Sequence, residues 1–180
     1  FRNVNTNLIN TSYTVGSVVK MGTISAGYKY NVIDIGTSVV DSCVKLYQVP
    51  VKCSYKSLGK INDLTAISKS SNYYQFKIAL GLTGINYKYN MKLDTTINDF
   101  EKLRSVYREY GLNTITGIDL PNETTGIIGN LTSSDLLLNL SIGQYDTYTP
   151  IGLFQYVNTI ANNGAKKSPQ LMKKVIYEND

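Results

Sequence analysis

The sequence predicts a mainly α-helical chain with a few short strands, and three segments carry most of that prediction. Residues 62–81, 96–110 and 149–161 each begin at a polar cap and carry apolar residues at helical spacing, which a polar connection interrupts in the first segment. Short apolar runs of the kind found in strands occur near residues 44–51, where Pro50 interrupts them. A length of 180 residues and a hydrophobic share of 42% fit one domain, or a large piece of one, with an ordinary core.

The first third of the chain gives weaker local signals. Residues 1–12 are polar and rich in asparagine, which predicts a loop. Residues 17–24 carry apolar side chains on most sides, which predicts a buried helix, although the β-branched pair Val18-Val19 weakens the local helix preference. Residues 29–54 alternate short apolar runs with Gly and Asp, which predicts loop and one or two short strands around 44–51.

The remaining elements have clearer boundaries, because caps, glycines and a proline stand at their ends. In order, they are a helix from Asn62, a polar connection at 68–72, a helix that ends at Gly81, a helix over 96–110 stopped by Gly111, a loop over 112–130, a short helix at 136–140 capped by residues 133–135, and a helix opened by Thr149-Pro150 that ends at 162–164.

Composition excludes several classes of function. The chain has no histidine, so it lacks the commonest general base and the commonest transition-metal ligand, and we expect no metal and no cofactor. The net charge of +5 comes from scattered lysines, which indicates a solvated basic surface rather than a nucleic-acid partner. These residues contain no apolar run of 18, which would be needed for a transmembrane helix, and no signal-peptide pattern.

The two cysteines leave two interpretations open. Cys43 and Cys53 lie ten positions apart, a spacing that matches no zinc pattern. They either form a disulfide across a hairpin or remain two thiols.

A serine and a lysine three residues apart give the most informative local motif. Ser17 and Lys20 would share one helical face, which places an amine within reach of a hydroxyl that it can deprotonate. Burial would lower the pKa of Lys20 toward that of a useful base, and the helix N-terminus would favour negative charge on the hydroxyl oxygen. On this pair alone, a capping serine beside a surface lysine is the alternative. The same spacing recurs at Ser42/Lys45 and Ser57/Lys60, but only Ser17 follows a glycine and enters an apolar stretch.

Four ordered motifs resemble the transpeptidase domain of penicillin-binding proteins. Residues 13–20, Tyr-Thr-Val-Gly-Ser-Val-Val-Lys, resemble the family's Tyr-x-Pro-Gly-Ser-x-x-Lys opening, with Val15 in place of proline. Residues 70–72, Ser-Ser-Asn, stand where the family has Ser-x-Asn. Residues 116–126 resemble its Gly-hydrophobic-Asp-Leu-Pro-Gly/Asn-Glu loop, and residues 141–150 its Ser-Ile-Gly-Gln to Thr-Pro segment. The combination is most typical of class B, elongation-type enzymes of low-GC Gram-positive bacteria.

The resemblance implies a role for each site residue. Ser17 would attack the penultimate D-alanine carbonyl of a peptidoglycan stem peptide ending in D-Ala-D-Ala, and Lys20 would accept its proton. Ser70 would relay a proton to the leaving D-alanine. Asn72 would bind the substrate amide and orient Lys20. A β-lactam antibiotic would trap Ser17 by imitating the D-Ala-D-Ala end, whereas Gly143 and Gln144 would support the cleft wall.

The resemblance also implies an α+β penicillin-binding and serine β-lactamase-like fold, of which this chain is mainly the helical lobe with minor strands. The family's third motif, a Lys-Thr/Ser-Gly strand, does not occur in the chain. We therefore expect residues 1–180 to form a partial transpeptidase domain, truncated before that strand and lacking the N-terminal sheet strands. Alone, such a piece would have little activity and would expose an apolar face to a partner chain or a second copy.

The implied setting is the extracytoplasmic face of a bacterial membrane, reached through an anchor outside these residues, with cell-wall elongation or division proteins as partners. Two alternatives stay open. One is a β-lactamase or β-lactam sensor of the same fold, for which Glu123 is the nearest candidate for a deacylating base. The other is a non-catalytic scaffold that binds other wall-synthesis proteins.

Overall fold

A computed structural model describes residues 4–176, and within them the chain is mainly helical. The elements, in chain order, are α1 (Val4–Ile9), a 3-10 turn η1 (Gly16–Val19), α2 (Lys20–Lys29), β1 (Val39–Val40), β2 (Cys43–Val44), β3 (Lys52–Cys53), β4 (Lys60–Ile61), α3 (Asp63–Ser68), α4 (Asn72–Leu82), α5 (Ile97–Tyr110), α6 (Ser134–Ser141) and α7 (Pro150–Ala161).

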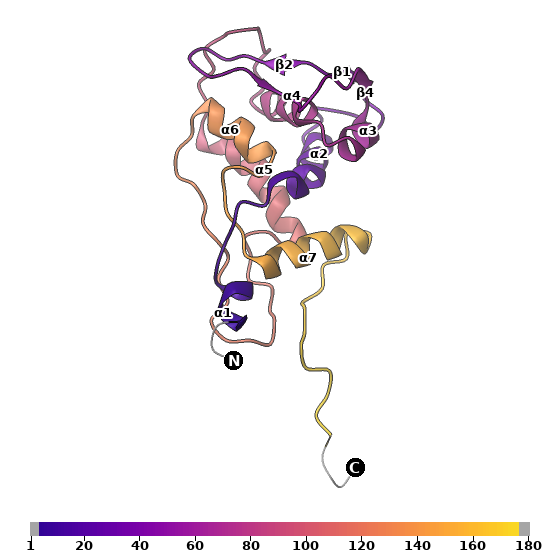
Figure 1. Ribbon diagram of the computed structural model, residues 1–180, viewed down its shortest axis with the longest axis vertical. Coiled ribbons are helices and arrows are strands. Elements are labelled where there is room, and N and C mark those ends of the chain that lie inside the picture. The colour runs from indigo at the N-terminus through magenta and orange to yellow at the C-terminus, as the bar shows by residue number, and fades with distance from the viewer. Residues whose placement is uncertain (1–3, 177–180) are drawn as a thin grey trace.

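Helix α2 lies at the centre of the fold. It packs against α4 and α5, while α6 covers α4 and α7 crosses below α5 (Figure 1). Val19, Ile24 and Ala26 of this central segment belong to the main hydrophobic core. Burying one face of each helix against its neighbours supplies most of the stability, because the intrinsic preference of short helices is marginal.

Four two-residue strands form two small antiparallel pairs, β1 with β4 and β2 with β3. Cys43 and Cys53 lie opposite each other in the second pair and are joined by a disulfide. The sequence anticipated short strands near this position. However, residues 45–51 form the connection between β2 and β3, and β1 and β4 were not anticipated.

The predicted caps are confirmed at three helices. Asn62 and Thr65 form a reciprocal capping box at the start of α3. The Thr149 hydroxyl accepts a hydrogen bond from the Gly152 N–H, with Pro150 at the first position of α7. Gly111 ends α5 with φ 116°, a left-handed conformation that favours glycine. The predicted end of α4 at Gly81 is one residue short, since the helix continues to Leu82.

The prediction of a loop over residues 1–12 is wrong in part, and its first three residues lie outside the described range. Residues 4–9 form α1, which lies against α7 at the lower end of the helical body (Figure 1). Ile9 is buried with Ile118 and Ile151, and its carbonyl accepts a hydrogen bond from the Thr124 N–H at 2.9 Å. Contacts with residues more than 100 positions away therefore override the weak local helix preference.

After α7 the chain leaves the helical body as an extended segment (Figure 1). The Asp119 carboxylate holds this segment by accepting the backbone N–H groups of Leu171 at 2.7 Å and Met172 at 2.8 Å. Within residues 4–176, no helix is long and apolar enough to cross a membrane.

Candidate active site

The candidate nucleophile, Ser17, lies on the tight turn η1 and is exposed. Gly16 precedes it with φ 59°, and the Gly16 N–H donates to the Gly143 carbonyl at 3.0 Å. Gly143 packs so closely that a Cβ added to it would lie 2.2 Å from the Gly16 carbonyl oxygen. The segment around residue 143 thus packs against the turn that carries the exposed Ser17.

Lys20 is the first residue of α2, and its side chain is 2% exposed. Its ammonium donates three hydrogen bonds, to the Ser70 carbonyl at 2.8 Å, the Ser70 hydroxyl at 2.9 Å and the Asn72 Oδ1 atom at 2.7 Å. Burial lowers the pKa of the Lys20 ammonium from 10.5 to about 8. A substantial fraction of the amine is therefore neutral near physiological pH and able to accept a proton.

Ser70 connects the lysine to the exposed serine. Its hydroxyl lies 3.1 Å from the Ser17 Oγ atom and 2.9 Å from the Lys20 Nζ atom. Among the described residues, Lys20 reaches Ser17 through this hydroxyl rather than by a direct hydrogen bond. Ser70 has φ 51°, an uncommon left-handed conformation for a residue with a side chain. The same strained residue thereby offers both its carbonyl and its hydroxyl to Lys20.

Asn72 begins α4, immediately after this connection. Its Oδ1 atom accepts from Lys20, and its Nδ2 group donates to the Cys53 carbonyl at 3.4 Å. The first N–H groups of α4 are bonded by two serines, Ser54 from the end of the β2–β3 hairpin and the N-cap Ser71. The motif at residues 70–72 is therefore fixed between α2 and the hairpin.

A buried tyrosine on α7 holds the other side of the same turn. The Tyr156 hydroxyl donates to the Val19 carbonyl at 3.1 Å and accepts from the Gly22 N–H at 2.7 Å. Sequence reasoning missed both Tyr156 and Ser54. A polar hydroxyl within the apolar series of residues 151–161 was the available signal for Tyr156, and no sequence signal pointed to Ser54.

All four predicted site residues, Ser17, Lys20, Ser70 and Asn72, lie in one hydrogen-bonded chain. The other Ser-x-x-Lys serines, Ser42 and Ser57, are exposed on the strand-rich segment. Glu123 accepts the N–H groups of Thr116 at 2.7 Å and Gly117 at 3.2 Å, so its carboxylate closes its own loop.

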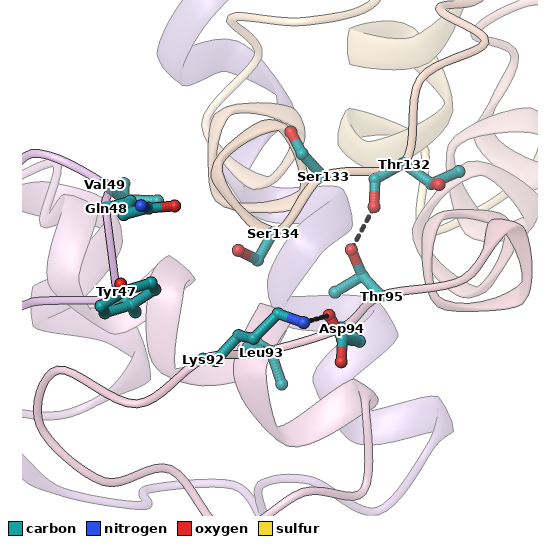
Figure 2. Close-up of a pocket in the computed structure, with 10 residues that line it drawn as sticks. All are labelled: Tyr47, Gln48, Val49, Lys92, Leu93, Asp94, Thr95, Thr132, Ser133 and Ser134. Atoms are coloured by element: carbon teal, nitrogen blue, oxygen red, sulfur yellow. Dashed lines mark hydrogen bonds and ion pairs between the residues drawn. The ribbon is translucent and has the colours of Figure 1, made fainter.

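A separate hollow of about 400 Å³ lies between the connection after β2, residues 92–95 and the start of α6 (Figure 2). Its lining includes the exposed ion pair between Lys92 and Asp94 at 3.3 Å. None of the four candidate residues lines this hollow. Within the described part of the chain, no group of three or more Cys, Asp or Glu side chains could hold a metal ion.

The comparisons with known proteins agree with the motifs. A family model described as "Penicillin binding protein transpeptidase domain" matches residues 2–180. The chain belongs to this family, and the described part corresponds to the helical lobe of its fold.

Two curated penicillin-binding proteins are similar to nearly the whole chain. Penicillin-binding protein H of Bacillus subtilis is 40% identical over 166 residues, which are 92% of this chain and 23% of that protein. Penicillin-binding protein 2B of Streptococcus pneumoniae strain D39 is 38% identical over 178 residues, 96% of this chain and 26% of that protein. The chain thus spans about a quarter of the length of the curated relatives it matches.

Solved structures give the same fold. Penicillin-binding protein 2B from S. pneumoniae strain R6 superposes with a TM-score of 0.86 at 38% identity, covering 92% of this chain and 28% of that one. A complex between penicillin-binding protein PBP2 and MreC from Helicobacter pylori matches with a TM-score of 0.73 at 27% identity, covering 91% and 30%.

Proposed function

We propose that this protein is a penicillin-binding D,D-transpeptidase that cross-links peptidoglycan stem peptides through an acyl-enzyme on Ser17. The observation that carries the proposal is the chain from the Ser17 hydroxyl through the Ser70 hydroxyl to the buried Lys20 amine. A serine needs a base to become a nucleophile, and a lysine with a pKa of about 8 serves at neutral pH.

In the first step, neutral Lys20 takes a proton from Ser70 as Ser70 takes one from Ser17. The Ser17 oxygen then bonds to the carbonyl carbon of the penultimate D-alanine. The Ser17 backbone N–H supplies one donor to the oxyanion. As the peptide bond breaks, the proton returns from Lys20 through Ser70 to the leaving D-alanine nitrogen. The amine of a second stem peptide then attacks the acyl carbon and gives a proton to Lys20. The bond to the Ser17 oxygen breaks, that proton returns through Ser70 to the Ser17 oxygen, and the new amide bond completes the cross-link.

We further propose that residues 1–180 are part of a longer domain whose sheet lobe supplies the Lys-Thr/Ser-Gly strand and the second oxyanion donor. The proposal is supported by the greater length of the relatives. Loss of one oxyanion donor costs about 100- to 1000-fold in rate. Residues 1–180 alone should therefore react with penicillin at least about 100-fold more slowly than a form with the complete domain.

The proposed setting follows from the same chemistry. The substrates are stem peptides ending in D-Ala-D-Ala, and β-lactam antibiotics are trapped on Ser17. A membrane anchor outside these residues would hold the protein at the extracytoplasmic face. Cell-wall elongation or division proteins are the proposed partners, supported by the likeness to the PBP2 component of a complex with MreC.

Intact-mass detection of a penicilloyl adduct tests the proposal. The full-length protein should gain one adduct per molecule, Ser17→Ala should gain none, and the control Ser57→Ala, at another Ser-x-x-Lys position, should react like the unchanged protein. An adduct that persists in Ser17→Ala would contradict the assignment. Rapid nitrocefin turnover would instead favour a β-lactamase, and an unreactive full-length protein would favour a scaffold.

A further inference from the structure

The β2–β3 hairpin ends against the start of α4. Ser54 directly follows β3, and its side chain is buried. Its hydroxyl accepts the N–H groups of Asn72 at 3.1 Å and Tyr73 at 3.2 Å, and it lies 3.2 Å from the hydroxyl of Ser71. One side chain from the hairpin therefore satisfies two backbone donors that a helix N-terminus leaves without intrahelical partners.

The carbonyl before Ser54 helps to orient the Asn72 amide. That amide lies between the Lys20 ammonium, which donates, and the Cys53 carbonyl, which accepts. An asparagine side chain has one acceptor end and one donor end, so only one orientation satisfies both neighbours. A flipped amide would turn its NH₂ group toward the ammonium and its oxygen toward a carbonyl. The hairpin backbone thus reinforces the orientation that the Lys20 ammonium requires.

The hairpin itself needs support. Its strands are two residues each, and an isolated hairpin of two strands is marginally stable in water. The disulfide between Cys43 and Cys53 joins the strands at the residue whose carbonyl meets Asn72. Lys52, in the same strand, also pairs with Asp135 at the start of α6 at 2.8 Å. The covalent link fixes the hairpin end nearest the candidate site.

We infer that Ser54 and Cys53, held by the disulfide, are positioning residues that keep the Asn72 amide oxygen facing the Lys20 amine during acylation. The inference rests on the proposed acyl-transfer function. Losing this control should slow acylation about fivefold, the size expected for one positioning hydrogen bond. It should also move the pH of half-maximal acylation downward, because the protonated amine loses an acceptor and burial is the cause already lowering the Lys20 pKa.

The first test measures penicillin acylation of the full-length protein against pH. Ser54→Ala should show both the slower rate and the downward shift in pH. Ser54→Thr keeps the hydroxyl, so its acylation rate and pH profile should match those of the unchanged protein. Ser54 borders a hollow of about 430 Å³, which offers space for the added methyl group. Ser105→Ala removes a partly buried hydroxyl on α5 and should change neither. Unchanged rate and pH profile in a folded Ser54→Ala variant would overturn the inference.

The second test needs no substitution at Ser54, so it tests the inference even if Ser54→Ala fails to fold. Reduction with a phosphine, followed by mass counting of alkylated thiols, should slow acylation and shift its pH profile as Ser54→Ala does. A Cys43→Ser/Cys53→Ser double variant should acylate at the rate of the reduced protein, and the phosphine should not change that rate. Full reduction with an unchanged profile would refute the inference, whereas no adduct under any condition would refute the proposed function itself.

Discussion

At the scale of single residues, the site depends on placing a charged amine where water cannot reach it. Lys20 is 2% exposed, and its ammonium donates to the carbonyl and hydroxyl of Ser70 and to the Asn72 amide oxygen rather than to a carboxylate. Because no opposite charge offsets the free-energy cost of removing the ammonium from water, its pKa falls to about 8. The folded state therefore carries a stability cost at Lys20, which fits its proposed role as the base.

This cost gives a pH dependence of stability with a definite sign. Between pH 8 and 10.5 the unfolded chain binds more protons at Lys20 than the folded chain, so the free energy of unfolding rises with pH. We expect Lys20 to contribute a gain of about 1 kcal/mol between pH 8 and about pH 9, where tyrosines with an ordinary pKa near 10 are still mostly protonated. Urea denaturation of residues 1–180 at several pH values measures it.

The matched variants isolate that contribution. Lys20→Met keeps the side-chain length without the charge, so its free energy of unfolding should lack the rise. Lys45→Met removes another lysine and should keep it. Equal slopes in Lys20→Met and the unchanged chain would assign the rise to other groups.

Among these residues, sequence reasoning found those that a local motif marks. Ser17 and Lys20 are three positions apart, and Ser70 and Asn72 are two positions apart. Short sequence motifs are therefore enough to identify them. Ser54 and Tyr156 act through hydrogen bonds that span 18 and 137 positions. A single sequence can mark a polar hydroxyl in an apolar series, as at Tyr156, but it does not show which distant group that hydroxyl contacts, because such contacts exist only after the helices have packed.

At the scale of elements, the same distinction separates predicted from missed structure. Helix α5 has its own capping box and terminal glycine, so its bounds could be predicted. Helix α1 depends on burial of Ile9 against distant residues, and the two-residue strands have too few positions to show a period. The turn η1 likewise depends on its neighbours, since Gly143 in the loop after α6 and Tyr156 on α7 both hydrogen-bond to it.

Substitution of Gly143 tests this support. Gly143→Ala would force a Cβ to within 2.2 Å of the Gly16 carbonyl oxygen and hold a residue with a side chain at φ 75°. We expect a loss of about 3 kcal/mol in the free energy of unfolding, from overpacking and strain together. Gly84→Ala is the matched control, because Gly84 has φ 71° with no atom within 4 Å of the added Cβ, so it should lose only about 1 kcal/mol. Equal losses in the two variants would show that contact with Gly16 is unimportant.

At the scale of the whole molecule, a well-packed helical body contrasts with an extended segment held by few contacts. Two side chains hold the segment that follows α7. The Gln155 side chain donates to the Lys167 carbonyl at 3.0 Å, and Asp119 accepts the N–H groups of residues 171 and 172. The side chains of Leu171 and Met172 are themselves exposed. Asp119 lies in the loop that resembles the family's Asp-Leu-Pro motif, so that loop directs the course of the C-terminal segment.

Hydrogen exchange of the backbone amides tests that role. Asp119→Ala removes both acceptors, so the amides of Leu171 and Met172 should exchange at least about fivefold faster, while the core of α5 keeps its protection. Asp94→Ala removes an exposed carboxylate paired with Lys92 and should leave the exchange of these amides unchanged.

The hydrogen bonds also lower the pKa of the Asp119 carboxyl below its usual 3.8. Protection should therefore persist through pH 4 and disappear as the pH falls through the lowered pKa. Protection at both amides that survives in Asp119→Ala would show that the segment is held by other contacts.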